Sequence, residues 1–168
     1  MTLDEISAHL EIQQVLYRYC RGVDRGDAEM IAGVYHPDAI DNHGAWKGRG
    51  IDFGAYLVPA MDKVPLIGQH HITNILIELS GEHADVESYF VAFHPENAGD
   101  TARLALVGGR YLDRFELRNG VWLIADRVVV LDVTRVLDHM NDWPGAAYFP
   151  AGGRRERDPS AATGVGAA

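Results

Sequence analysis

Basic residues are scarce in this sequence. It contains 15 Lys and Arg against 24 Asp and Glu, which gives a formal net charge of -9. Nucleic acids and anionic membrane surfaces bind proteins through clusters of positive charge. The shortage of basic residues therefore argues against both, and we expect neither nucleic acid nor a membrane among the partners of this chain.

Cysteine and long apolar runs are scarce as well. Cys20 is the only cysteine, so no intramolecular disulfide can form, which is typical of reducing compartments. No apolar stretch is long enough to cross a bilayer. The first residues, MTLDEISAHL, lack the basic end and apolar run of a signal peptide. Together these absences lead us to expect a cytoplasmic protein.

The common motifs for cofactors, metals and nucleophiles are also missing. The sequence has no phosphate-binding loop, no dinucleotide-binding glycine pattern, no G-x-S-x-G and no H-E-x-x-H. Metal binding remains the rival of catalysis for the histidines, because HPDAIDNH supplies His36, Asp38, Asp41 and His43. The spacing of these four residues matches no established metal site, so we expect neither a metal nor a cofactor.

The hydrophobic pattern present in the chain predicts one α+β domain. Ile12, Val15, Leu16, Tyr19 and Val23 form an apolar helical stripe that ends at Gly26. A short helix over residues 28–35, a loop over 36–49 and a helix over 50–61 are expected to follow. After Pro65 the period changes to two, which predicts strands over 70–79, 84–94, 102–117 and 121–137. Asn119-Gly120 is a strong hairpin signal between the last two strands.

Helices followed by a meander of long antiparallel strands indicate helices packed on a curved sheet. We expect residues 1–149 to form this single domain. Residues 150–168, rich in Gly and Ala, have little to bury and are expected to form a flexible C-terminal tail.

Two adjacent histidines open the first predicted strand. Neighbours on a strand point to opposite faces, so His70 and His71 cannot both face one pocket. By alternation His71 shares the more apolar face with Ile75, Ile77 and Leu79, which favours His71 for the interior. Either histidine can be structural or catalytic on this evidence alone.

Two further charged residues stand in unfavourable positions. Arg127 lies in the middle of an apolar strand face, where it needs a paired acid such as Asp24 or an anionic ligand. Asp24 lies near a helix C-terminus, where its charge opposes the helix dipole and indicates another role, such as pairing with a histidine. Tyr19 and Asp24 are separated by about 140 degrees around a helix, so both face one cavity only if the helix ends or turns between them, as Gly22 permits.

Three stretches resemble the NTF2-like, SnoaL-like superfamily of cone-shaped α+β barrels, over roughly residues 5–150. They are IQQVLYRYCRGVDRGD, HHITNILIEL and GGRYLDRFELRNGVWLIADRVV. The branch they resemble contains scytalone dehydratase, bile-acid dehydratase and lindane dehydrochlorinase. The resemblance implies Asp24 and His70 as the catalytic acid–base dyad, with Tyr19 and Arg127 as further catalytic residues. It thus reverses the choice between the histidines from His71 to His70.

The resemblance implies a cofactor-independent lyase, dehydratase or isomerase that acts on a small hydrophobic, cyclic substrate. His70 would abstract a proton, Asp24 would orient the ring, and Tyr19 and Arg127 would stabilise negative charge. Further candidates for the substrate pocket are His43, Asn74, Tyr89, Arg110 and Trp143. Relatives are often trimers, so we expect a homo-oligomer, a trimer before a dimer.

Two other functions fit the same resemblance. The cone can bind a ligand without chemistry, as in many relatives, or the chain can be the small subunit of an aromatic-ring-hydroxylating dioxygenase. The identity of the substrate, and the choice between dehydration, isomerisation, cyclisation and dehydrohalogenation, stay open at this point.

Overall fold

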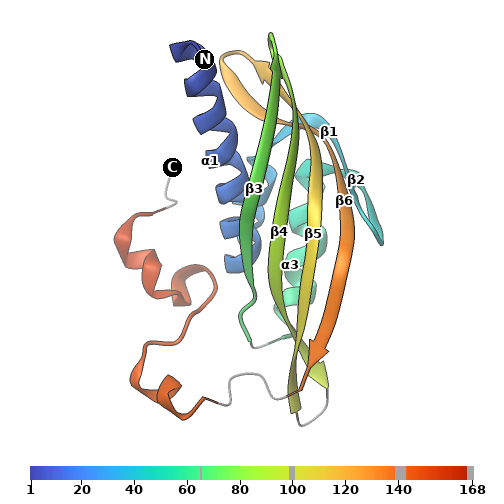
Figure 1. Cartoon of the computed structure of the whole chain (residues 1–168). Helices are drawn as coiled ribbons and strands as arrows, with labels where there is room; N and C mark the ends of the chain where they lie inside the picture. The colour runs from blue at the N-terminus through green and yellow to red at the C-terminus, as the bar shows by residue number, and fades with distance from the viewer. Residues whose placement is uncertain (65, 99–100, 139–142, 166–168) are drawn as a thin grey trace.

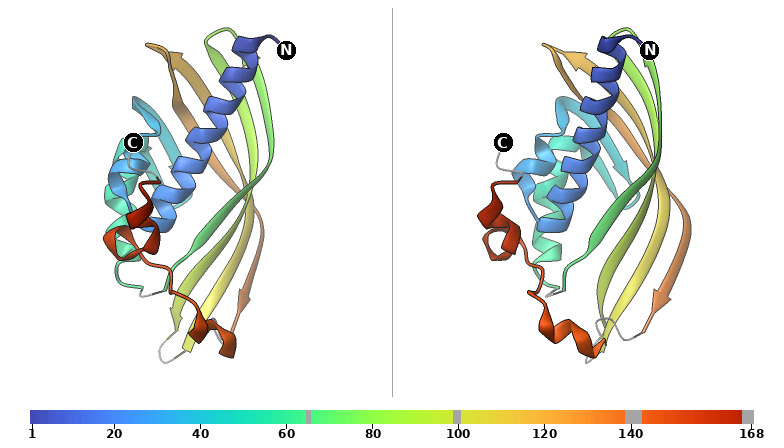
Figure 2. Two further views of the ribbon diagram at one scale, coloured as in Figure 1. Left: turned by 90° about the vertical axis from the view of Figure 1, so that its left-hand side faces the viewer. Right: turned by 60° about the vertical axis from the view of Figure 1, so that its left-hand side comes forward.

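The computed structural model describes residues 1–64, 66–98, 101–138 and 143–165. Helices cover one face of a six-stranded curved sheet, and none of the described helices lies on the opposite, convex face (Figures 1 and 2). The strand order is β2-β1-β6-β5-β4-β3, so the sheet is open at both edges. The α+β cone predicted from the sequence is therefore confirmed, with helices on the concave side and two more strands than predicted.

Helix α1 (Leu3–Arg25) begins at a capping box, in which Thr2 accepts from the backbone of Glu5 and Glu5 accepts from that of Thr2. Its predicted apolar stripe is buried, and Gly26 ends it in the left-handed conformation. The helix does not turn at Gly22. That glycine instead admits Ile31, because a Cβ atom there would lie 3.0 Å from the Ile31 side chain. No described helix is long and apolar enough to span a membrane.

The segment after α1 departs from the prediction. Helix α2 (Ala28–Ala32) is shorter than predicted, because Gly33 ends it and Tyr35 already pairs with the sheet. The expected loop contains strands β1 (Tyr35–His43) and β2 (Trp46–Arg49), which form a hairpin before helix α3 (Gly50–Met61). The polar composition of this segment does not indicate strands. Pairing with neighbouring strands, rather than local propensity, holds β1 and β2 in the sheet.

The remaining strands form the predicted meander. They are β3 (Gln69–Ser80), β4 (His83–Ala98), β5 (Thr101–Arg118) and β6 (Val121–Leu137), and each pairs antiparallel with the next. The Asn119-Gly120 turn joins β5 to β6 as predicted, with both residues at positive φ. β1 joins β6 in parallel and so brings the polar HPDAIDNH stretch beside Arg127.

A β-bulge at Asn74 resolves the conflict between the two faces of β3. Thr73 pairs with Tyr89 and Ile75 with Ser88, so Asn74 is an extra residue, at φ 43°. An extra residue exchanges the faces of everything that follows it. His70 before the bulge and the apolar positions after it therefore share the concave side, although strict alternation assigns them to opposite faces.

A second irregularity in β6 has the same effect. Arg114 pairs with Asp126 and Phe115 with Ile124, which leaves Ala125 as the extra residue. Ile124 and Arg127 consequently both point to the interior and are 0% exposed. Strict alternation along β6 would place Leu123 and Ala125 on the same face as Arg127. The extra residue makes that assignment wrong.

The C-terminal segment contains three short 3-10 helices, at Pro144–Tyr148, Arg155–Arg157 and Pro159–Thr163. It lies beside the C-terminal end of α1 (Figure 2). Buried Asp158 lies 3.4 Å from Arg25, and Arg155 pairs with Asp62. Polar contacts therefore tie this segment to the helices, while the division into a domain of residues 1–149 and a flexible tail stays a prediction.

Candidate functional site

Asp24 and His70 meet where the end of α1 faces the start of β3. The Asp24 carboxylate lies 2.7 Å from His70 Nδ1, and its second oxygen accepts a hydrogen bond from the His70 backbone N–H at 3.1 Å. The side chains are 10% and 7% exposed. Two contacts to one carboxylate fix the ring, place the proton on Nδ1 and leave Nε2 free for another partner.

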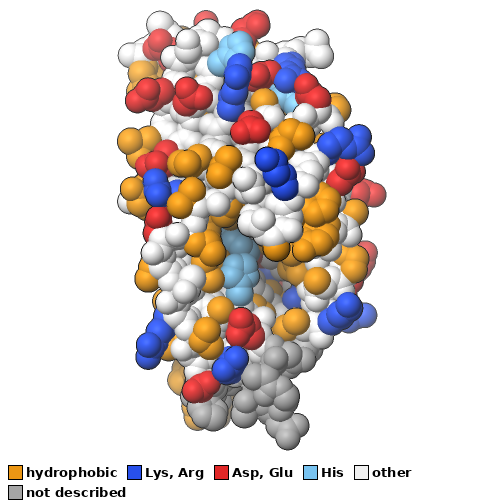
Figure 3. Space-filling view, turned by 90° about the vertical axis from the view of Figure 1, so that its right-hand side faces the viewer, with side chains coloured by type: hydrophobic (Ala, Val, Ile, Leu, Met, Phe, Trp, Pro, Cys, Tyr) orange, Lys and Arg blue, Asp and Glu red, His pale blue; other side chains and the backbone are white. Residues whose placement is uncertain are grey.

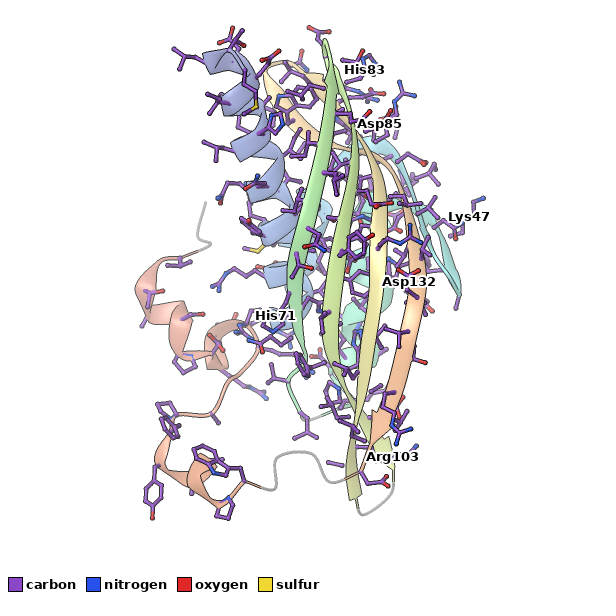
Figure 4. All side chains as sticks on the ribbon, viewed as in Figure 1. Lys47, His71, His83, Asp85, Arg103 and Asp132 are labelled. Atoms are coloured by element: carbon purple, nitrogen blue, oxygen red, sulfur yellow. The ribbon has the colours of Figure 1, made fainter. Side chains whose placement is uncertain are left out.

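The neighbouring histidine does not enter the site. His71 is exposed, and its ring meets that of Phe93 edge-to-face at 5.6 Å between centroids. Figure 4 labels His71 beside β3. The structure thus places His70 beside Asp24, whereas alternation alone favours His71.

The free edge of His70 opens into a cavity of about 460 Å³ between the helices and the concave side of the sheet. Figure 3 shows histidine side chains in a hollow that hydrophobic side chains surround. The cavity wall is mostly apolar and aromatic: Val23, Trp46, Phe53, Tyr56, Leu57, Met61, Phe90, Val107, Tyr111, Val129 and Leu131. Such a cavity suits a hydrophobic ring compound.

Among the described residues, three histidines line this cavity: His43, His70 and His94. The rings of His70 and His94 meet edge-to-face at 4.9 Å between centroids. Burial, and to a smaller degree the nearby His70, lower the pKa of His94 to about 4. Within the described residues no three His, Cys, Asp or Glu side chains form a group that could hold a metal ion.

The pKa of His94 predicts a loss of stability in acid. The unfolded chain takes up a proton at His94 below about pH 6.5, whereas the folded chain does so only near pH 4. The contribution of neutral His94 to the free energy of unfolding is therefore fully present above pH 6.5 and is lost as the pH falls from 6.5 to 4. At about pH 4.5 we expect wild type to have lost about 2 kcal/mol more than His94→Gln, which cannot titrate. Urea unfolding of both proteins at neutral and acid pH measures the difference, and equal losses would contradict it.

Tyr19 lines the cavity and Arg127 lies behind it. Burial raises the pKa of Tyr19 above its ordinary value, so its hydroxyl stays protonated. Arg127 is completely buried and donates two hydrogen bonds of 2.7 Å to Asp113. Its guanidinium lies between the rings of Tyr19 and Tyr111, 4.2 Å from each centroid. Arg127 is therefore not among the cavity-lining residues, and its partner is Asp113 rather than Asp24.

Of the five further pocket candidates, the structure places only His43 in the cavity wall. Asn74 is exposed in the bulge, and Tyr89 is 38% exposed on the convex face. Arg110 pairs on that face with Glu87 and Asp132 (Figure 4, which labels Asp132). Trp143 is 64% exposed near the end of the chain. These four side chains therefore lie outside the cavity wall.

The sequence analysis missed other residues around the site. Arg154 lines the cavity and donates hydrogen bonds to the carbonyls of Val64 and Leu66, although its segment has the composition of a tail. Asp113 carries no signal except alternation, which places it on the face of Tyr111 and Phe115. Asp41 and His43 are two residues apart, a spacing that indicates a shared strand face only once the segment is recognised as a strand.

The comparisons with known proteins agree with this architecture. The sequence pattern of the SnoaL-like domain family matches residues 4–128. The uncharacterized protein Rv2910c of Mycobacterium tuberculosis is 29% identical over 132 residues, which is 76% of this chain and 88% of that protein.

Two solved structures share the fold at low identity. Hexachlorocyclohexane dehydrochlorinase LinA-type3 from Novosphingobium barchaimii superposes with a TM-score of 0.73 at 20% identity, over 84% of this chain and 98% of that one. A scytalone dehydratase-like protein from Novosphingobium aromaticivorans gives 0.70 at 19% identity, over 85% and 99%. These likenesses establish the shared fold.

Proposed function

This chain belongs to the SnoaL-like domain family, and on that premise we propose that it is a cofactor-independent lyase of the dehydratase type. His70 abstracts a proton from a carbon atom of a small hydrophobic, cyclic substrate. The observation that carries the proposal is the 2.7 Å contact between Asp24 and His70 Nδ1, which turns Nε2 into an apolar cavity. Histidine is the side chain that most often serves as a general base in proton transfer.

The surroundings of His70 support this role. Asp24 holds the ring in one tautomer and stabilises the imidazolium that forms when His70 takes the proton. The Tyr19 hydroxyl, which burial keeps protonated, can donate a hydrogen bond to a developing enolate oxygen. The apolar wall excludes water and strengthens both interactions. The names of the two structural neighbours, a dehydrochlorinase and a dehydratase-like protein, also describe eliminations.

Proton abstraction can be tested without knowledge of the natural substrate. Wild-type protein is incubated in D₂O with cyclic ketones such as β-tetralone, and deuterium at the carbon beside the carbonyl is measured by NMR. We expect exchange that exceeds the rate with free imidazole at the same concentration, because the cavity holds base and ketone together. Ketones that bind without exchange would contradict the proposal and favour a ligand-binding module.

We also propose that the protein is a cytoplasmic homo-oligomer, with a trimer favoured over a dimer. Apolar side chains on the convex face support association, since Leu76, Tyr89, Val91 and Leu112 are each at least 36% exposed. Sedimentation equilibrium of the full chain tests the stoichiometry, and a monomer at micromolar concentration would contradict it.

A further inference from the structure

A second aspartate–histidine pair lies on β1, in another part of the cavity wall. Asp41 and His43 are two positions apart on one strand, so both side chains project from the same face. The Asp41 side chain is completely buried, whereas His43 is 25% exposed and lines the cavity. The arrangement repeats that of Asp24 and His70, with a buried carboxylate behind a ring that faces the cavity.

Several contacts fix the orientation of the His43 ring. Its Nδ1 lies 3.3 Å from one oxygen of Asp41, and the other oxygen accepts a 2.8 Å hydrogen bond from the Tyr35 hydroxyl. The ring stacks on Phe53 of α3, with 4.4 Å between the centroids and 23° between the planes. Within the described part of the chain Nε2 has no hydrogen-bond partner. The free nitrogen of His43 is therefore available to a ligand, as that of His70 is.

A carboxylate and aromatic rings contact the His43 ring. Asp41 contributes a negative charge in direct contact, and an adjacent carboxylate stabilises an imidazolium. The rings of Phe53 from α3 and Tyr111 from β5 are uncharged neighbours. His94 of β4, which also acts on this region, stays neutral because burial lowers its pKa to about 4.

From this geometry we propose that His43 is a second catalytic residue, the proton donor to the leaving group, and that Asp41 is its positioning residue. The inference rests on the proposed function and assigns the other half of the elimination. His70 takes the proton from carbon, and the C–H electron pair becomes the new C=C bond. The C–O bond breaks towards oxygen, which takes the proton from His43 Nε2 and leaves as water. His70 then releases its proton to solvent, and His43 regains one.

A proton donor restricts the substrate class. Hydroxide is a poor leaving group and departs readily only when it is protonated, whereas chloride departs as the free anion. The His43–Asp41 pair is therefore superfluous for dehydrochlorination and useful for loss of water. The substrate class that fits both pairs is a cyclic β-hydroxy carbonyl compound, whose acidic C–H faces His70 and whose hydroxyl faces His43.

The two histidines can be separated with one probe, a cyclic β-hydroxyketone in D₂O. Deuterium exchange beside the carbonyl reports on His70, and enone formation reports on the whole elimination. For His43→Gln we expect enone formation about 10²-fold slower and exchange nearly unchanged. Asp41→Asn, which keeps the size of the side chain, should slow enone formation by about 10-fold. Chloride release from hexachlorocyclohexane, if present in wild type, should be insensitive to both substitutions.

The matched control is Asn42→Ala, since Asn42 lies between the pair and points to the opposite face of β1. It should leave enone formation unchanged. A His43→Gln protein that loses exchange and elimination equally, or loses neither, would overturn the proposal. Circular dichroism of each variant identifies failure to fold.

A spectroscopic readout separates this proposal from the proposed function. Nitrogen-15 NMR shows which ring nitrogen carries the proton in neutral histidine. We expect Nδ1–H for His43 in wild type and a mixture of tautomers in Asp41→Ala. If wild type exchanges no ketone proton, the proposed function fails, and the tautomer of His43 still decides its orientation. A neutral His43 protonated at Nε2 in wild type would overturn the second pair.

Discussion

His70→Ala is expected to fold like wild type and to exchange the ketone proton about 10³-fold more slowly. The substitution removes the only base of the Asp24–His70 pair. It keeps the 3.1 Å hydrogen bond from the backbone N–H of residue 70 to Asp24, so the contact between β3 and α1 survives. The rate is measured by NMR in D₂O, and thermal unfolding by circular dichroism checks the fold.

The adjacent histidine provides the control for this experiment. His71→Ala removes an identical side chain from the next position, on the face that points away from the cavity. It should exchange the ketone at the wild-type rate. Added imidazole should partly restore His70→Ala, because the space left by the ring opens into the cavity. Equal rates for the two variants would show that neither histidine abstracts the proton.

Asp113→Ala is expected to lower the free energy of unfolding by about 3–5 kcal/mol. Arg127 and Asp113 are both 0% exposed at their side chains and share two hydrogen bonds of 2.7 Å. Without the carboxylate, the guanidinium stays buried between Tyr19 and Tyr111 and loses both hydrogen bonds to its paired acid. Urea unfolding monitored by circular dichroism measures the loss.

Two further variants test this explanation. Asp132→Ala breaks an ion pair with Arg110 on the convex face, where solvent screens the charges, and should leave the urea midpoint almost unchanged. The double variant Asp113→Leu with Arg127→Met should recover much of the loss, because it leaves no unpaired buried charge. A double variant as unstable as Asp113→Ala would show that packing, not charge, causes the effect.

Most of the fold can be predicted from the sequence because it depends on local patterns. The stripe of α1, the capping residues at both of its ends and the Asn119-Gly120 hairpin follow from neighbouring residues. Strands β1 and β2 cannot be predicted from local patterns. Their polar residues give no alternation that indicates a strand, and pairing with β6, more than 80 residues away in the chain, holds β1 in place.

The residues of the candidate site could likewise be predicted only in part. The resemblance implies Asp24 and His70 as a dyad, and the structure places the two side chains in contact. Their catalytic role stays a proposal. Asn74, Tyr89, Arg110 and Trp143, the other pocket candidates, are absent from the cavity wall. One inserted residue in a strand reverses every face assignment after it, and a bulge of this kind has no reliable local signal.

By itself the sequence determined the acidic charge, the order of helices and long strands, and the presence of a histidine able to pair with Asp24. The tertiary structure alone decided which side chains share the cavity. The bulge at Asn74 joins the His70 face to the apolar face of β3, and the parallel pairing of β1 brings Asp41 and His43 to the same wall. Such neighbours depend on strand register and on contacts between distant segments, which are fixed only when the whole sheet has formed.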